Sequence, residues 1–242
     1  MKELFILSFS FFFFSSSAQV WWDFGVRGGV NSGFIINSSI LDHAEYPHQW
    51  TLGNFFSGRA GTNFGEHSIL SVEYGRTNTS QKWYFGGEGS QFYRTIDWSA
   101  NDWVILYRHV GDLGSYFEIG PKFSRVQSAS QELSGEIPAG VVLDNDLTPY
   151  FTETYTTAVF GFGSYLAGTE NLSFILSFRL EYGIQDLFSG NENNVGFPVE
   201  FNPDAQGAAS HPLLLQVGLE INYDIGYLVS PRCADRYKFV TF

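Results

Sequence analysis

The 242-residue sequence is poor in cysteine and in charge. Its single Cys, Cys233, cannot form an internal disulfide. Charged residues make up 16% of the chain, which is sparse for a soluble domain. Asp and Glu number 25 against 13 Lys and Arg, and the net charge of −12 argues against nucleic acid as a partner, because phosphate binding needs clustered cations.

Long apolar runs are also missing after the N-terminus, so the sequence predicts no transmembrane helix. The one apolar run, residues 4–14, follows Lys2 and precedes the small residues Ser16 and Ala18. This pattern predicts a signal peptide over residues 1–18, cleaved before Gln19. A membrane anchor is the weaker alternative, because the run is too short to span a bilayer as a helix.

Motifs for catalysis and metal binding are absent as well. The five His and the single Cys show no paired spacing of the kind that holds a metal, and the loop acids do not follow a calcium-loop pattern. His43 beside Asp42 and His211 beside Ser210 are adjacent in sequence only, which does not assemble a nucleophile and a base. We therefore expect no catalytic residue, no metal ligand, no bound cofactor and no enzymatic activity.

Alternation of apolar and polar residues is what the sequence does contain. In residues 219–226, Leu219, Ile221, Tyr223 and Ile225 share one side of an extended chain and polar residues or glycine share the other. Similar patterns occur at residues 22–34, 50–64, 69–76, 116–124 and 172–185, while 102–110 and 155–166 are extended by propensity but ambiguous in facing. A soluble sandwich or an outer-membrane barrel would each produce such ribbons.

The connecting segments favour the barrel. Long segments at 37–49, 77–90, 127–149 and 189–211 alternate with short ones at 65–67, 111–114 and 167–171. Barrels of the outer membrane have tight periplasmic turns and long extracellular loops. The sequence predicts an all-β fold, an up-and-down antiparallel transmembrane β-barrel of about eight strands over residues 19–228, followed by a C-terminal tail over 229–242.

Two sets of side chains are expected to carry out distinct roles in this barrel. Amphipathic aromatics near strand ends should lie at the membrane interfaces; they are Trp21, Trp22, Trp50, Trp83, Trp103 and Tyr227. Charged residues on the polar faces should form an ion-pair network that plugs the lumen; they are Asp23, Arg27, Arg59, Glu73, Glu118, Lys122, Arg179, Glu181, Glu220 and Asp224, with Arg108 as a further candidate from a segment of ambiguous facing.

Three segments also resemble a known family. "YFEIGPKFSRV", "NLSFILSFRLEYGIQDLF" and "LQVGLEINYDIGYL" are similar to segments of the small outer-membrane β-barrel domain proteins, called porin-like or PorT-like. The resemblance covers residues 22–228 and implies the fold and an outer-membrane location. It implies no functional residues, because the family shares no catalytic motif.

These observations favour a non-enzymatic outer-membrane protein with a plugged polar lumen and a structural or interaction role through its extracellular loops. Two alternatives stay open: a narrow conduit or carrier for a small solute, and a subunit of an envelope secretion or assembly machine. The expected partners are outer-membrane lipids, the barrel-assembly machinery during biogenesis and possible envelope proteins.

Overall fold

The computed structural model describes residues 20–37, 47–65, 67–85, 92–169, 171–188, 209–225 and 240–241. The long strands are β1 (Val20–Asn37), β3 (Gly53–Phe64), β4 (Ser68–Phe85), β5 (Phe92–Val110), β6 (Ser115–Gly135), β7 (Thr154–Gly168), β8 (Leu172–Gly183) and β9 (Ser210–Ile225). Three short elements accompany them: β2 (His48–Gln49), β10 (Val240–Thr241) and the 3-10 turn η1 (Thr148–Tyr150).

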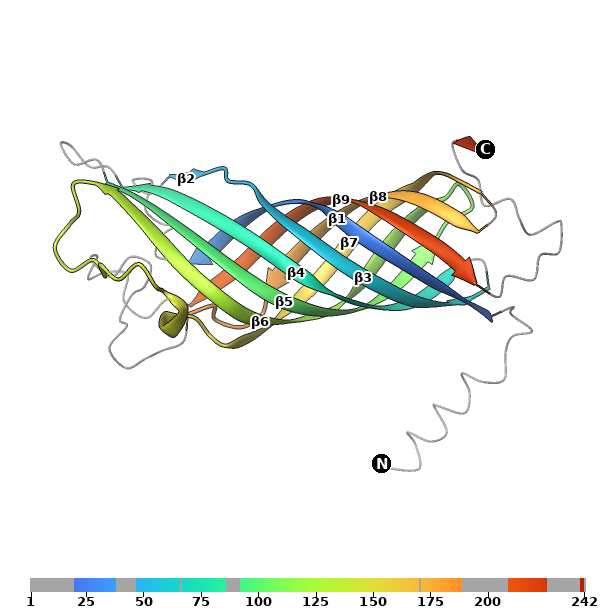
Figure 1. The fold of residues 1–242 in the computed structure, drawn as a ribbon, viewed down its shortest axis with the longest axis horizontal. Coiled ribbons are helices and arrows are strands. Elements are labelled where there is room, and N and C mark those ends of the chain that lie inside the picture. The colour runs from blue at the N-terminus through green and yellow to red at the C-terminus, as the bar shows by residue number, and fades with distance from the viewer. Residues whose placement is uncertain are drawn as a thin grey trace, which may run out of the picture.

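The eight long strands form a closed antiparallel ring (Figure 1). Each strand pairs with the next along the chain, and β1 closes the ring against β9 over sixteen residue pairs, from Trp22↔Ile225 to Asn37↔Ser210. Tight connections at 65–67, 111–114 and 169–171 gather at one end of the ring, and the longer ones gather at the other. The predicted up-and-down barrel of eight strands is confirmed.

The two shortest strands lie outside the ring. β2 pairs with the C-terminal part of β4, at the end of the barrel that bears the longer connections, which is called the upper end below. β10 pairs in parallel with Ala167 and Gly168 of β7. The predicted signal peptide, and the predicted tail apart from β10, lie outside the described residues. Within the described part of the chain, no helix is long and apolar enough to cross a membrane.

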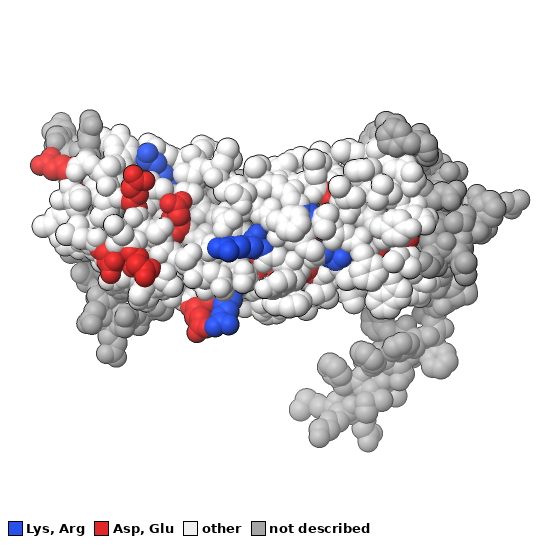
Figure 2. All heavy atoms as spheres, viewed as in Figure 1, with Lys and Arg blue, Asp and Glu red and all other residues white. Residues whose placement is uncertain are grey.

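The half of the barrel that carries the tight turns has an apolar exterior. On β9, Leu215, Val217, Leu219, Ile221, Tyr223 and Ile225 are exposed, while the residues between Gln216 and Asp224 that alternate with them are mostly buried and polar. The predicted facing of 219–226 is therefore correct. The surface of this half is mostly free of charge in Figure 2, whereas acidic side chains gather at the opposite end.

The strands are longer than the sequence pattern indicated. The segments 77–85 and 127–135 were expected to be loop, yet they continue β4 and β6, and β6 reaches 21 residues. A membrane crossing needs only about 9–11 tilted residues, so the sheet continues beyond the apolar band. The prediction erred because the outward positions of these segments are mainly polar and apolar side chains such as Trp83 and Phe85 point inward, the reverse of the pattern in the apolar band.

In the half of the barrel that bears the longer connections, the inner face is mainly apolar, with Arg94 bonded to Gln131 inside it, and the outer face is mainly polar. On β5, Phe92, Ile96 and Trp98 are buried, while Asp97 is exposed. These side chains join Trp83, Leu147, Phe151 and others in one hydrophobic core inside the ring. Such polarity suits water outside and a protein interior within, the reverse of the arrangement in the apolar band.

Substitution of Leu219 tests the lipid-facing assignment. Leu219 is 60% exposed at the centre of the β9 band, so Leu219→Arg is expected to lower the free energy of unfolding by about 2–4 kcal/mol. The control is Ser130→Arg on the exposed face of upper β6, where a change within about 0.5 kcal/mol is expected. Urea titration in liposomes measures both, and equal tolerance would contradict the assigned band.

Candidate functional site

The lumen at the level of the apolar band is filled by charged side chains. All ten residues predicted to point inward are buried, and they come from β1, β3, β4, β6, β8 and β9. Arg108 of β5, which was also expected to point inward, is buried too, and the structure adds Asp102 of the same strand. The closure of the ring brings together residues that are up to about 200 positions apart in the chain.

Glu220 is the centre of the larger cluster. Arg108 donates from Nη1 and Nη2 to the two carboxylate oxygens of Glu220 at 3.0 and 2.8 Å. Arg59 donates from Nη1 to Glu220 Oε1 at 2.7 Å, and Asn222 adds a bond to the same oxygen at 2.6 Å. The carboxylate of Glu220 on β9 therefore holds two guanidinium groups, one from β3 and one from β5.

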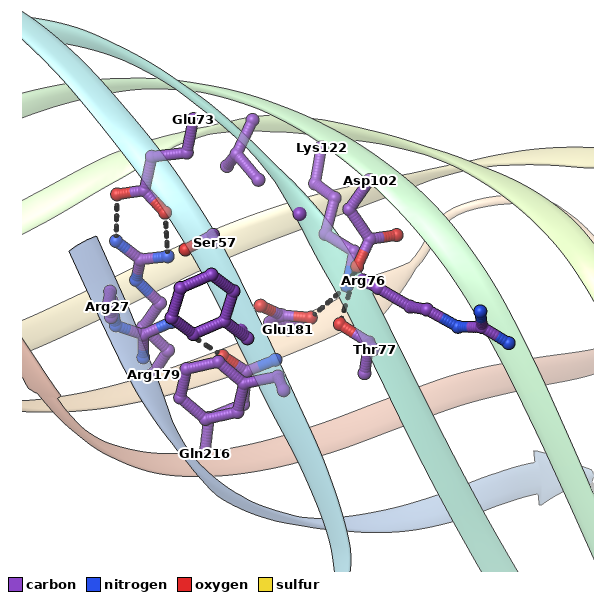
Figure 3. Close-up of a pocket in the computed structure, with 14 residues that line it drawn as sticks. Arg27, Ser57, Glu73, Arg76, Thr77, Asp102, Lys122, Arg179, Glu181 and Gln216 are labelled. Atoms are coloured by element: carbon purple, nitrogen blue, oxygen red, sulfur yellow. Dashed lines mark hydrogen bonds and ion pairs between the residues drawn. The ribbon is translucent and has the colours of Figure 1, made fainter.

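The cluster continues through Glu118 to Arg179 and Glu73. Glu118 accepts from Arg108 Nε at 3.0 Å and from Arg179 Nε at 2.5 Å. Arg179 then donates from both Nη atoms to Glu73 at 2.7 and 2.6 Å, a bidentate pair visible in Figure 3. Planar bidentate pairing of this kind fixes the orientation of both groups.

A second cluster lies beside the first and is built around Lys122. Its Nζ lies 2.7 Å from Glu181 Oε2 and 3.1 Å from Asp102 Oδ2. Thr77 donates to the same Asp102 oxygen at 2.6 Å (Figure 3). Lys122 thus bridges two carboxylates from β5 and β8.

The remaining predicted residues lie around these clusters. Arg27 donates to Ser177 Oγ and Gln216 Oε1, each at 3.0 Å, and its guanidinium lies 4.3 Å from the centre of the Phe55 ring. Asp23 lies 3.5 Å from Arg59. Asp224 is the cross-strand neighbour of Asp23 and is buried beside it.

This network leaves little free space. The cavity between the clusters, lined by Arg27, Glu73, Asp102, Lys122 and Arg179 among others, has a volume of about 20 Å³. A single water needs roughly 10–15 Å³ measured in this way. Four of the five buried cations here pair with carboxylates and Arg27 donates to Ser177 and Gln216, so the cavity left between these described side chains is too small for a substrate. Among the described residues, no group of three His, Cys, Asp or Glu is placed to hold a metal ion.

The interface prediction for the aromatics was partly wrong. Trp22 and Trp103 are outward and 55% and 54% exposed, and Trp50 is 73% exposed between β2 and β3. Trp21 and Trp83 are instead 2% and 1% exposed. Tyr227 lies outside the described residues.

The two errors have a common physical reason, which is the period of two along a strand. Trp21 precedes the outward Trp22, so its side chain points into the lumen. Trp83 lies on the part of β4 that was taken for a loop edge, and there it packs inward beside Phe85, with ring centroids 6.5 Å apart.

The closed ring has paired charges inside and an apolar band outside. Such an exterior is stable in hydrocarbon, and this combination identifies the class of fold. The chain is a transmembrane β-barrel of the outer-membrane type. The resemblance seen in the sequence is confirmed at this level, and the narrower PorT-like grouping stays a prediction.

Comparison with solved structures gives distant matches. No family model and no curated protein matches the sequence. Among solved structures, the barrel is similar to Neisserial surface protein A, with 12% identity, 83% of this chain and 96% of that chain covered, and a TM-score of 0.38. It is also similar to Ail of Yersinia pestis, with 10% identity, 84% of this chain and 99% of that chain covered, and a TM-score of 0.37. For OprG of Pseudomonas aeruginosa the identity is 10%, the covered shares are 86% and 99%, and the TM-score is 0.32. Matches this distant say nothing about ligand or activity.

Removal of the Glu220 carboxylate tests the network. Glu220→Leu leaves Arg59 and Arg108 without their shared partner in a buried site, and we expect a loss of about 3–5 kcal/mol in the free energy of unfolding. The matched control is Glu153→Gln, which removes the exposed partner of Arg125 and should cost at most about 1 kcal/mol. Urea unfolding followed by tryptophan fluorescence compares the two variants. A loss of at most about 1 kcal/mol for Glu220→Leu, as for the control, would show that the lumen pairs are dispensable.

Proposed function

We propose that this protein is a non-enzymatic, non-conducting barrel of the bacterial outer membrane, with a structural or interaction role carried by the part that projects beyond the bilayer. The observation that supports this proposal is the filled lumen. Four cations (Arg59, Arg108, Lys122 and Arg179) pair with six carboxylates (Asp23, Glu73, Asp102, Glu118, Glu181 and Glu220) inside the ring. Arg27 is buried beside them and donates to Ser177 and Gln216. An aqueous channel requires a wider barrel, of about 16 strands.

The half of the barrel beyond the apolar band, here called the projecting half, supports an interaction role for its outer surface. Its own hydrophobic core closes the interior above the charge network, so a partner meets only the outside. That outside carries exposed acids, among them Glu132, Asp144 and Asp146, and they gather at the end of the barrel that bears the long loops (Figure 2). Hydrogen bonds from the side chain and backbone of Thr148 lower the pKa of Asp146, which keeps this carboxylate ionised in a mildly acidic medium.

The location follows from the same proposal. Export by the signal peptide of residues 1–18, with cleavage before Gln19, would deliver the chain to the periplasm. The barrel-assembly machinery would then insert it, because a closed sheet with an apolar band is stable only in a bilayer. The tight turns would face the periplasm and the projecting half would face outward.

Conductance in planar bilayers tests the closed lumen. The refolded protein, with insertion verified by heat-dependent gel mobility, is expected to give no reproducible single-channel steps, because the space between the clusters admits roughly one water. A 16-stranded general porin in the same bilayers is the positive control. Uniform steps from the wild-type barrel would contradict the proposal and favour a solute conduit.

A further inference from the structure

The outward-facing cations of the barrel are confined to one sector. Of the nine Lys and Arg in the described ranges, six point inward: Arg27, Arg59, Arg94, Arg108, Lys122 and Arg179. The other three are Arg76 and Lys82 on β4 and Arg125 on β6. No described residue of β1, β3, β7, β8 or β9 adds an outward Lys or Arg, so this sector differs in charge from the rest of the barrel exterior.

Arg76 and Arg125 belong to the same row across the sheet. Arg76 pairs with Asn101 of β5, and Asn101 pairs with Arg125 of β6. Neighbouring strands are about 4.8 Å apart, so the two arginines are separated by roughly 10 Å along this row. Both side chains are exposed and long enough to reach a common ligand.

The row directly below is aromatic. Tyr74 pairs with Trp103, and Trp103 pairs with Phe123. All three are outward and between 46% and 54% exposed. They form the upper edge of the apolar band in this sector, so the arginine row lies at the level where hydrocarbon gives way to polar headgroups.

The exterior is hollowed on both sides of the arginine row. Below and beside Arg125, a groove of about 490 Å³ is lined by Tyr74, Asn101, Trp103, Phe123 and Gln127 among others. Above Arg76, a hollow of about 300 Å³ is lined mainly by amides and hydroxyls, including Asn54, Asn78, Ser99 and Ser128, with Asp97. From the band upward, the sector therefore offers aromatic rings, then cations, then mainly neutral hydrogen-bonding groups with one carboxylate, that of Asp97.

The arginines keep donors available in this arrangement. Arg76 donates from Nη2 to Ser99 Oγ at 3.2 Å, and in the described part of the chain it lies within ion-pair distance of no carboxylate. Arg125 donates from Nη2 to Glu153 Oε1 at 2.8 Å, an exposed pair. A guanidinium has five N–H donors, so each side chain retains several for an anion.

We propose that the outward face of β4, β5 and β6 binds one phosphorylated glycolipid of the surrounding leaflet. Its acyl chains lie against Tyr74, Trp103 and Phe123, and its phosphate accepts from Arg76 and Arg125. Its sugar occupies the hollow above, where amide and hydroxyl groups match the hydroxyl groups of a saccharide.

The order of aromatic rings, cations and hydrogen-bonding groups fits a phosphorylated glycolipid better than other ligands. A free phosphate would use the arginines alone and leave the aromatic groove without a role. A zwitterionic phospholipid would use the groove but would bring a cation next to Arg76 and Arg125. A protein partner would have to lie against the edge of the apolar band, which is in contact with lipid. The inference rests on the barrel's position in a membrane and is independent of whether the lumen conducts.

Native mass spectrometry of the folded full chain in a neutral detergent tests the site. The probes are diphosphoryl lipid A, phosphatidylcholine and inorganic phosphate. We expect the wild type to retain one diphosphoryl lipid A, and the double variant Arg76→Gln/Arg125→Gln to bind it at least tenfold more weakly. Trp103→Ala is expected to weaken binding severalfold, because the acyl chains lose part of their contact.

The matched control is Lys82→Gln, which removes the third outward cation, above the row, and should leave the affinity within twofold. Heat-dependent gel mobility verifies that every variant is a folded barrel. The proposal is overturned if the double variant keeps the wild-type affinity, if phosphatidylcholine binds equally well, or if millimolar inorganic phosphate displaces the lipid. A result of this kind would leave the conductance test of the closed lumen unaffected.

Discussion

Closure of the backbone hydrogen-bond ladder is the constraint on which this structure depends. In hydrocarbon, no water can satisfy an unpaired N–H or C=O group, so a sheet can cross only if its first and last strands pair. The pairing of β1 with β9 from Trp22↔Ile225 to Asn37↔Ser210 meets that requirement. Closure also fixes a bore so narrow that the inward side chains of eight strands must fill it.

The filling of the bore follows from the exterior. Where lipid covers the outside, the period of two places the polar residues inward, and charges enclosed there must pair with one another. Glu220, Arg108 and Arg179 satisfy this through multidentate bonds. Where the sheet leaves the bilayer the outside becomes polar, and the same bore is filled by a hydrophobic core around Phe92, Ile96 and Trp98. The row of Arg76, Asn101 and Arg125 lies at this change.

Much of the fold and of the lumen could be read from the sequence because alternation is a local signal. The facing of Leu219 and Glu220 follows from their neighbours, and so does the inward position of Arg27 or Glu118. Asp102 and Arg108 were harder, because Val104 and Leu106 between them are apolar and point inward too, which blurs the pattern. The outward Trp103, Ile105 and Tyr107 were the available signal.

The extended strands could not be predicted in the same way. Trp83 and Trp98 look like interface or loop aromatics to a pattern that assumes lipid on the apolar side, yet they are in the core above the membrane. The pairings among Arg59, Glu220 and Arg108 depend on ring closure and on the tilt of the strands, and no local pattern contains them. The binding row is likewise a property of register, since Arg76 and Arg125 are 49 positions apart and meet only through Asn101.

Along one continuous sheet the outer face changes from apolar to polar, and a spin-label scan of outward positions on β4 tests this change most directly. Single Cys variants at residues 70, 72, 74, 78, 80 and 84, in a Cys233→Ser background and in liposomes, report access to oxygen from lipid and to a water-soluble nickel chelate. We expect oxygen-dominated access up to Tyr74 and nickel-dominated access from Asn78 onward. Uniform access to the nickel chelate along the whole strand, or lipid exposure that continues to Tyr84, would contradict it.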